Sequence, residues 1–306
     1  MPGPLRRLAD FLAYTHLWLG IGAASQAGLA VLYAGALYHG GRGDVLGSVL
    51  YLPVVLSGTV ALYGAHRLIG LRRLGQERLV GRWRAIARQV HAIRTLSIVC
   101  GTSALLLYAL LPWAWQWRLL LPGAVGLLYV VPVVGRGRLR DAGVLKVAFL
   151  SVGWVGVTTW VPLAAIADGQ SPQPGLPPAA MWIVCGERML FMLGHSLAFD
   201  YRDIAFDVRD RVLTLPARMG RRATRAISVA LVALSVAVIA RYSLADGSIL
   251  DPAAYLAATS LLALPLLWRA FRDPRPGDAY FALGLDGLFA LPGILLLLRV
   301  LAVAVS

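Results

Sequence analysis

The chain has 306 residues, of which 58% are hydrophobic and only 14% are charged, and its mean hydropathy is +0.70. A soluble globular protein is roughly 45–50% apolar, so the composition excludes that class and predicts a membrane protein. The net charge of +14 indicates basic residues retained on the cytoplasmic side of a membrane, and we expect no nucleic-acid partner. At about 20 apolar residues per spanning helix, the chain can hold about nine or ten spans and little else.

Apolar segments follow one another along the chain, separated by short connections that mostly contain glycine or proline. The first of these segments is too long for the h-region of a cleavable signal peptide, so we expect none. We predict one all-α membrane domain over residues 1–306. Its nine expected transmembrane helices are 15–38, 46–66, 95–112, 118–134, 143–167, 179–199, 224–244, 252–270 and 279–303.

The distribution of basic residues predicts the direction of insertion. With the N-terminus in the cytosol, the arginine-rich connections after the second, fourth, sixth and eighth spans all lie on the inner side. Two long inner connections, 67–94 and 200–223, are expected to form a cytosolic cap, the first with an amphipathic helix along the membrane surface. We therefore expect an integral protein of a bacterial inner (plasma) membrane, in contact with membrane lipids, whose active-site face is cytosolic.

An acidic stretch at the cytosolic end of the sixth span is the clearest candidate site. On a helix its aspartates lie within an arc of about 80°, with Arg202 and Arg209 on the opposite face. Such a stripe suits Mg²⁺, which takes one or two carboxylates and completes its shell with water and substrate phosphates. The alternative is a solvated helix end whose carboxylates pair with the basic connections. The four aspartates are Asp200, Asp203, Asp207 and Asp210.

The acidic stretch belongs to a longer pattern. Residues 200–207 read Asp-Tyr-Arg-Asp-Ile-Ala-Phe-Asp and are followed by a Thr-Leu-Pro run at 214–216 and by Gly220. A second segment, Tyr-Val-Val-Pro at 129–132, is followed by the basic residues Arg138 and Lys146. The first pattern resembles the second aspartate-rich motif of the UbiA superfamily of intramembrane prenyltransferases. The second is similar to the Tyr-x-x-Pro segment of that family, and the resemblance covers essentially the whole chain.

The resemblance implies a helical bundle around a central cavity that opens sideways to lipid. In the family, two aspartate-rich motifs on helices two and six hold Mg²⁺ ions, which bind the diphosphate of an isoprenoid donor. Ionisation leaves a carbocation that an aromatic or lipid-soluble acceptor captures. For this chain the resemblance implies a Mg²⁺-dependent enzyme that transfers or cyclises a prenyl chain. The alternative is a non-catalytic relative that binds a polyprenyl lipid or a partner protein.

The chain departs from the family where the first motif should stand. The family pattern there resembles N-D-x-x-D-x-x-x-D, whereas residues 63–72 contain no carboxylate, and His66 and Arg67 align with Asn-Asp. Because a guanidinium has a fork geometry suited to phosphate, Arg67 could contact the diphosphate in place of a metal. In the alternative, Arg67 pairs with Asp203 or Asp207 and closes an inactive site. The expected residues are Asp203, Asp207, Arg67, Lys146 and Tyr129 for catalysis, His66, Arg67, Arg72, Arg138 and Lys146 for diphosphate binding, and Asp200, Asp203 and Asp207 as Mg²⁺ ligands.

Polar residues inside the spans are further candidates. Glu187 and Arg188 are expected to face the bundle interior, where charge is tolerated, and to point toward different partners because they are adjacent. His195 is either a proton acceptor beside the cavity or a hydrogen-bonded interior histidine. Ser25 and Gln26 are expected at helix contacts, with acceptor binding as the alternative.

Overall fold

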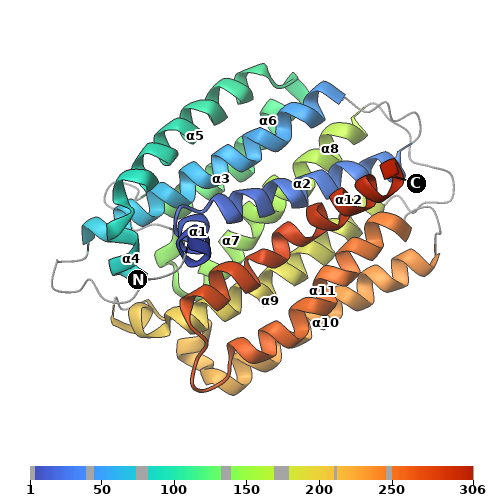
Figure 1. The fold of residues 1–306 in the computed structure, drawn as a ribbon. Coiled ribbons are helices and arrows are strands. Elements are labelled where there is room, and N and C mark those ends of the chain that lie inside the picture. The colour runs from blue at the N-terminus through green and yellow to red at the C-terminus, as the bar shows by residue number, and fades with distance from the viewer. Residues whose placement is uncertain are drawn as a thin grey trace.

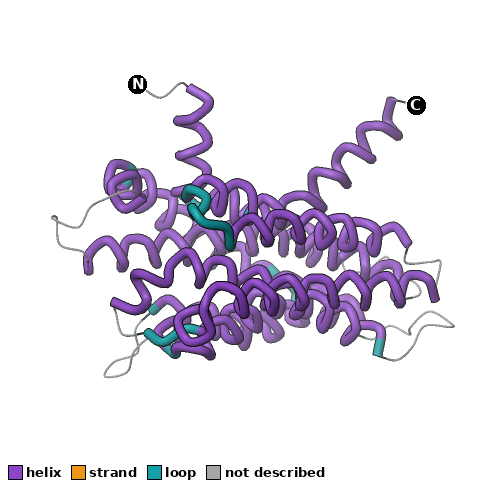
Figure 2. Tube along the Cα trace, turned by 90° about the horizontal axis from the view of Figure 1, so that it is seen from below, coloured by secondary structure: helices purple, strands orange, loops and turns teal. Residues whose placement is uncertain are grey.

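A computed structural model describes residues 4–38, 45–73, 82–131, 139–168, 179–209, 212–245 and 250–305. These residues fold into helices joined by short turns (Figures 1 and 2), which confirms the all-helical class. The α-helices are α1 (Pro4–Tyr14), α2 (Leu17–Leu37), α3 (Val45–Arg73), α4 (Arg82–Arg88), α5 (Val90–Leu110), α6 (Trp113–Val130), α7 (Lys146–Val155), α8 (Val161–Ala167), α9 (Ala180–Arg209), α10 (Leu215–Ala245), α11 (Leu250–Ala270) and α12 (Gly287–Val305). Two π-helices, η4 (Gly156–Trp160) and η6 (Tyr280–Leu285), and two short 3-10 turns, η2 (Leu139–Asp141) and η3 (Gly143–Leu145), complete the set.

Each predicted span corresponds to a helix or to a run of helices. Within the described ranges, six segments are long and apolar enough to cross a membrane: α2, α3, α5, the α7–η4–α8 run, α10 and the η6–α12 run. Such segments are what an integral membrane protein requires. The helices that correspond to the other three predicted spans, α6, α9 and α11, are not among the six, and the apolar part of α11 is shorter than a full span. A count of nine spans and a cytosolic N-terminus stay predictions.

The long helices pack in a closed circuit. Helix α2 packs on α3 and α12, and the circuit continues through α11, α10, α9, α7 and α6 back to α3. Helix α5 lies outside the circuit and packs along α3 (Figure 1). Helix α1, which the sequence reasoning did not anticipate, runs across the others: it is seen end-on in Figure 1 and from the side in Figure 2.

Small residues bring neighbouring helices into close contact, as is usual in membrane bundles. A Cβ at Gly194 of α9 would lie 2.6 Å from the carbonyl oxygen of Ser228 on α10. The Ser228 hydroxyl in turn donates to the Gly194 carbonyl at 2.6 Å. Between α2 and α12, the amide of Gly293 donates to Ser25 Oγ at 2.6 Å, and Gln26 Nε2 donates to a carbonyl of α12 at 3.3 Å. Ser25 and Gln26 therefore lie at helix contacts, as expected.

The connections predicted at 67–94 and 200–223 are shorter than expected because the helices on either side extend into them. Helix α3 continues to Arg73 and α9 continues to Arg209, so the acidic stripe is a direct helical extension of its span. The short helix α4 occupies part of the predicted 67–94 connection and lies at the end of the bundle where α9 runs into α10 (Figure 1). Gly220 interrupts α10 with φ 74°, a conformation that side chains disfavour, which explains a glycine at this place in the motif.

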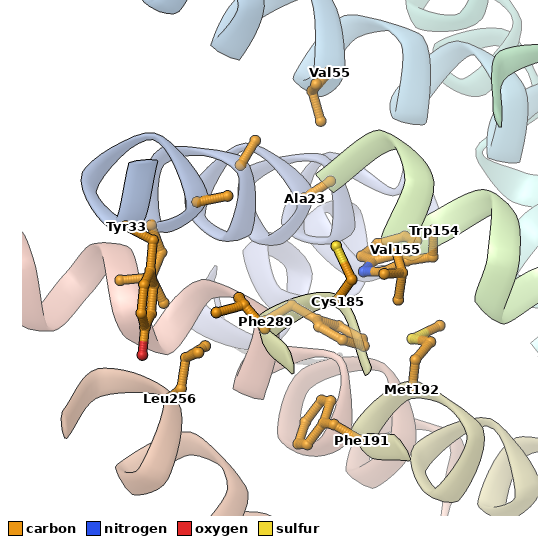
Figure 3. Packing of buried hydrophobic residues seen from close by; sticks show 14 of the residues in the cluster. Ala23, Tyr33, Val55, Trp154, Val155, Cys185, Phe191, Met192, Leu256 and Phe289 are labelled. Atoms are coloured by element: carbon orange, nitrogen blue, oxygen red, sulfur yellow. The ribbon is translucent and has the colours of Figure 1, made fainter. Parts of the chain in front are cut away.

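The apolar core lies between α2, α7, α9 and α12. Figure 3 shows Trp154, Val155, Cys185 and Phe289 gathered there. The rings of Trp154 and Phe289 are 4.8 Å apart between centroids, and Cys185 is a buried free thiol. This core forms the floor beneath the cavity that carries the candidate site.

Candidate active site

A cavity of about 900 Å³ is lined mainly by α3, α5, α6, α7 and α9, with further residues from α2 and α12. Along α3 its lining runs from Val54 to Arg67, a distance of about 20 Å at the rise of an α-helix. The end near Arg67 is lined by charged side chains, and the remainder is lined by aliphatic and aromatic ones. Because this volume lies in the upper part of the range for small-molecule sites, the cavity accommodates a ligand with a charged head and an apolar tail.

One wall of the cavity reaches the outer surface of the bundle. Leu105 of α5 and Leu127 of α6 both line the cavity and are 71% and 53% exposed. The cavity therefore reaches the surface of the bundle near α5 and α6, and an opening of this kind to lipid stays a prediction.

The acidic stripe is held by basic side chains from other helices. Lys146, the first residue of α7, lies 2.8 Å from Asp200 Oδ1 and 3.0 Å from Asp207 Oδ2 through its Nζ. The two aspartates are two helical turns apart on α9 and so share one face. All three side chains are buried. One lysine therefore neutralises part of the charge of two carboxylates.

Asp203 is paired with two arginines. Arg82 Nη1 of α4 donates to Asp203 Oδ1 at 2.8 Å. Arg202 donates through Nε to Oδ1 at 2.9 Å and through Nη2 to Oδ2 at 3.2 Å. Although Arg202 starts from another face of α9 than the aspartates, its long side chain reaches back to the neighbouring carboxylate and lines the cavity.

Burial and neighbouring charges shift the pKa values of the aspartates that lie beyond the predicted span 179–199. Desolvation raises the pKa of Asp203, but Arg202 and Arg82 outweigh it and hold the pKa well below the ordinary value of 3.8. Desolvation raises the pKa of Asp207, and Lys146 opposes it only in part. Of Asp203 and Asp207, Asp203 is therefore the carboxylate that stays ionised to the lower pH.

The two residues that replace the first motif, His66 and Arg67, each take part in a contact between an arginine and a histidine. Arg67 Nε donates to His16 Nε2 at 3.0 Å, at the turn between α1 and α2. His66 contacts the guanidinium of Arg140 through its Nε2. Arg67 therefore does not form the ion pair with Asp203 or Asp207 that would close the site, and Arg82 takes the place beside Asp203.

The other predicted site residues divide into three groups. Tyr129 and Lys146 line the cavity together with His66 and Arg67. Arg72 is exposed and is not part of the lining, so the structure does not bring it to the site. Arg138 and Asp210 lie outside the described residues.

Several residues of the site were not singled out from the sequence. His16 lies at the start of the first predicted span without any motif around it, and Arg82 is one of many arginines in the 67–94 connection. Arg140 was counted only as part of a basic connection. The single usable signal for Arg82 is the charge of the stripe, since buried carboxylates require basic partners.

Aromatic rings line the apolar part of the cavity. Trp154 lies 6.4 Å from Tyr63 and 4.8 Å from Phe289, measured between ring centroids. His195 lies 4.6 Å from Phe289 and 5.1 Å from Phe199. The ring of His195 also contacts the Leu285 carbonyl through Nε2 at 3.1 Å, which confirms an interior, hydrogen-bonded histidine. These rings present faces that attract a cation.

The buried pair Glu187 and Arg188 corrects one expectation. The Arg188 guanidinium binds both carboxylate oxygens of Glu187, so the adjacent residues are partners of each other rather than of different groups. Arg188 also donates to Ser260 Oγ at 3.2 Å and to Gln26 Oε1 at 3.4 Å. Because the Arg188 guanidinium donates to Glu187, Ser260 and Gln26, and neither residue of the pair lines the cavity, the pair is a structural contact between helices.

The carboxylates of Asp200, Asp203 and Asp207 are the predicted ligands of Mg²⁺. A magnesium site needs oxygen ligands free to converge on one point. Both oxygens of Asp203 accept from guanidinium groups, and one lysine lies between Asp200 and Asp207. Among the described residues no group of three His, Cys, Asp or Glu side chains is arranged to hold a metal ion. As arranged, the stripe does not fit Mg²⁺, which would first have to displace a basic side chain.

No family model and no curated protein sequence matches the chain. Solved structures do match over nearly its full length. A UbiA homologue from Aeropyrum pernix K1 without ligand has a TM-score of 0.63 at 16% identity, over 92% of this chain and 97% of that one. A UbiA homologue from Archaeoglobus fulgidus bound to GPP and Mg²⁺ has a TM-score of 0.60 at 14% identity, over 93% and 98%.

A third match is the structure described as digeranylgeranylglyceryl phosphate synthase, with a TM-score of 0.52 at 14% identity over 96% of each chain. The protein is thus a helical membrane bundle with a charged-and-apolar cavity. Its fold is that of the UbiA homologues, which is the fold that the sequence resemblance implied.

Proposed function

We propose that the chain is a divergent member of the UbiA superfamily and a prenyltransferase-like membrane enzyme. It binds an isoprenoid diphosphate with the diphosphate at the charged end of the cavity, and transfers or cyclises the prenyl chain. The observation that carries this proposal is a cavity that joins a cluster of buried and half-buried basic side chains to a long aromatic and aliphatic lining. The two parts match the two parts of such a donor.

The chemistry needs two things that the cavity supplies, positive charge for the leaving group and a dry aromatic lining for the prenyl chain, and an acceptor that the substrates supply. The allylic C–O bond breaks, and its electron pair leaves with the diphosphate oxygen, where basic side chains stabilise the developing charge. The prenyl cation that remains lies among the faces of Trp154, Phe289 and Tyr63, which favour a cation and exclude water. An electron pair of a lipid-soluble or aromatic acceptor, or of a double bond in the same chain, then forms the new bond and a proton is lost.

Homologues of the same fold support the donor class. Structures of the Archaeoglobus fulgidus homologue contain GPP with Mg²⁺ and DMAPP with Mg²⁺. For this chain, we propose that the protein lies in a bacterial inner membrane and that its active site faces the cytosol. Positive charge for the diphosphate has two possible sources: Mg²⁺ on Asp200, Asp203 and Asp207, as the resemblance implies, or the basic side chains of the cavity.

A second candidate function is the binding of a polyprenyl lipid without catalysis. The observation that favours it is that Lys146, Arg82 and Arg202 form ion pairs with Asp200, Asp203 and Asp207 of the acidic stripe. In that case the apolar cavity would hold a lipid chain while the charged end remained an internal ion-pair network.

Release of diphosphate distinguishes the two functions. Purified protein is incubated with allylic diphosphates of several chain lengths, with and without Mg²⁺ and candidate acceptors. An enzyme releases diphosphate, and Arg67→Gln should lower the rate by about tenfold or more, because a charge-assisted contact to the leaving group is lost. Arg88→Gln, an exposed arginine of α4 that is not part of the lining, is the matched control. Binding of a donor without release under any condition would favour the second function.

A further inference from the structure

Arg67 and Arg140, at the charged end of the cavity, form no direct ion pair with a carboxylate among the described residues, and a third arginine of the lining, Arg94, is exposed. Arg67 donates to His16 and Arg140 contacts His66, and all four side chains line the cavity. The ion pairs of this region involve other basic residues, namely Lys146, Arg82 and Arg202.

The histidine partners leave the charge of the two arginines in place. A guanidinium in a protein is protonated and has only donors. A ring nitrogen that accepts from it must offer a lone pair, so the imidazole of His16 is neutral at that atom. The histidine fixes the direction of the guanidinium without neutralising it. Each arginine also has five N–H donors, so most of them remain for a ligand.

A guanidinium without a direct ion pair near a membrane is costly, and here two lie beside one cavity, with Asp203 and Asp286 acting on Arg67, and Asp207 on Arg140, only at longer range. A diphosphate ester matches them, because phosphate groups carry up to about two negative charges each near neutral pH and accept two parallel hydrogen bonds from a guanidinium. The position of Arg67 is also the position at which the resemblance places a metal-binding carboxylate. At this position the family has a carboxylate that binds a cation, whereas this chain has Arg67, which is itself a cation.

We propose that Arg67 and Arg140 bind the diphosphate of the donor directly and without a divalent metal ion, with His16 and His66 as positioning residues. The aspartates of the stripe then have a different task from metal binding: they hold Lys146, Arg82 and Arg202 at the edge of the same site. This inference rests on the proposed function, since it names how that donor is held.

Binding of a hydrolysis-resistant donor tests the proposal apart from turnover. The probe is geranyl S-thiolodiphosphate, titrated calorimetrically into the full-length protein in EDTA and, separately, in Mg²⁺. The expected result is a dissociation constant in EDTA within about threefold of that in Mg²⁺, because the contacts are made by guanidinium groups. Arg67→Gln and Arg140→Gln should each weaken binding in EDTA by about tenfold or more, whereas Arg88→Gln should leave it unchanged.

The positioning role has its own readout. Replacing His66 by Asn keeps a hydrogen-bond acceptor for Arg140, whereas replacing it by Leu does not. We expect the Asn variant to bind the probe about as wild type does and the Leu variant to bind more weakly, with similar melting temperatures for both.

The outcomes separate this inference from the proposed function. Binding that occurs only with Mg²⁺, or that is unchanged in Arg67→Gln, overturns the metal-free clamp and leaves a donor-binding enzyme standing. Absence of binding in both conditions overturns both proposals.

Discussion

Replacement of Lys146 by methionine tests the ion-pair network most severely. The lysine lies 2.8 Å from Asp200 and 3.0 Å from Asp207 and is only 6% exposed in its side chain. Methionine has similar length without the charge, so the variant leaves two buried carboxylates without their cation. Removing one partner of a buried ion pair costs about 3–5 kcal/mol. With about 2 °C of melting temperature per kcal/mol for a chain of this size, the expected decrease is about 6–10 °C.

The assay is thermal unfolding of the purified protein in detergent, followed by circular dichroism at 222 nm as a signal of helix loss. The matched control is the triple variant Lys146→Met, Asp200→Asn, Asp207→Asn, which removes the charges on both sides. It should recover most of the lost stability, because no buried charge remains unpaired. Mg²⁺ should raise the melting temperature of the single variant more than that of wild type, since freed carboxylates become ligands. A single variant that melts within about 1 °C of wild type would refute the reasoning on buried pairs.

Three other changes test separate parts of the molecule. Asp203→Asn leaves two guanidinium groups without their carboxylate and should lower both stability, by about 3 kcal/mol, and diphosphate release; unchanged melting and release would show that these ion pairs matter little. Gly194→Val should destabilise by about 1–3 kcal/mol because its Cβ would meet the Ser228 carbonyl at 2.6 Å, while Gly186→Ala on the same helix has open space and should melt as wild type does. Phe289→Leu keeps an apolar wall without a ring face, so it should slow diphosphate release by about threefold to thirtyfold with unchanged binding of the thiolodiphosphate, and equal release rates would contradict a role in stabilising a cation.

Much of the fold could be predicted because it depends on local and repeated features. Each apolar segment of about 20 residues can be recognised without knowledge of its neighbours, and all nine predicted segments correspond to helical parts of the structure. The ends were less accurate: α3 and α9 run past the predicted limits, because a helix that leaves the apolar layer can continue when its charged residues find partners. Helix α1 was missed since eleven residues are too few for a span.

The site could be predicted only where a motif marked it. Asp200, Asp203 and Lys146 line one cavity, and Lys146 also lies against Asp207, while their predicted roles stay predictions. What the motif did not indicate is which cation neutralises which carboxylate. Arg82 reaches Asp203 from a helix 121 positions earlier in the chain, and such a long-range pairing depends on how α4 is placed over the bundle. In the same way, the partner of Arg67 is a histidine in a turn that has no motif of its own.

The most direct measurement is a structure of the protein with geranyl S-thiolodiphosphate in the absence of divalent metal ions. The diphosphate should lie between Arg67 and Arg140, with its oxygens within hydrogen-bond distance of both guanidinium groups, and the prenyl chain should extend toward Trp154 and Phe289. A ligand outside the cavity, or a diphosphate that appears only when Mg²⁺ is added and lies on the aspartates, would contradict the proposed site.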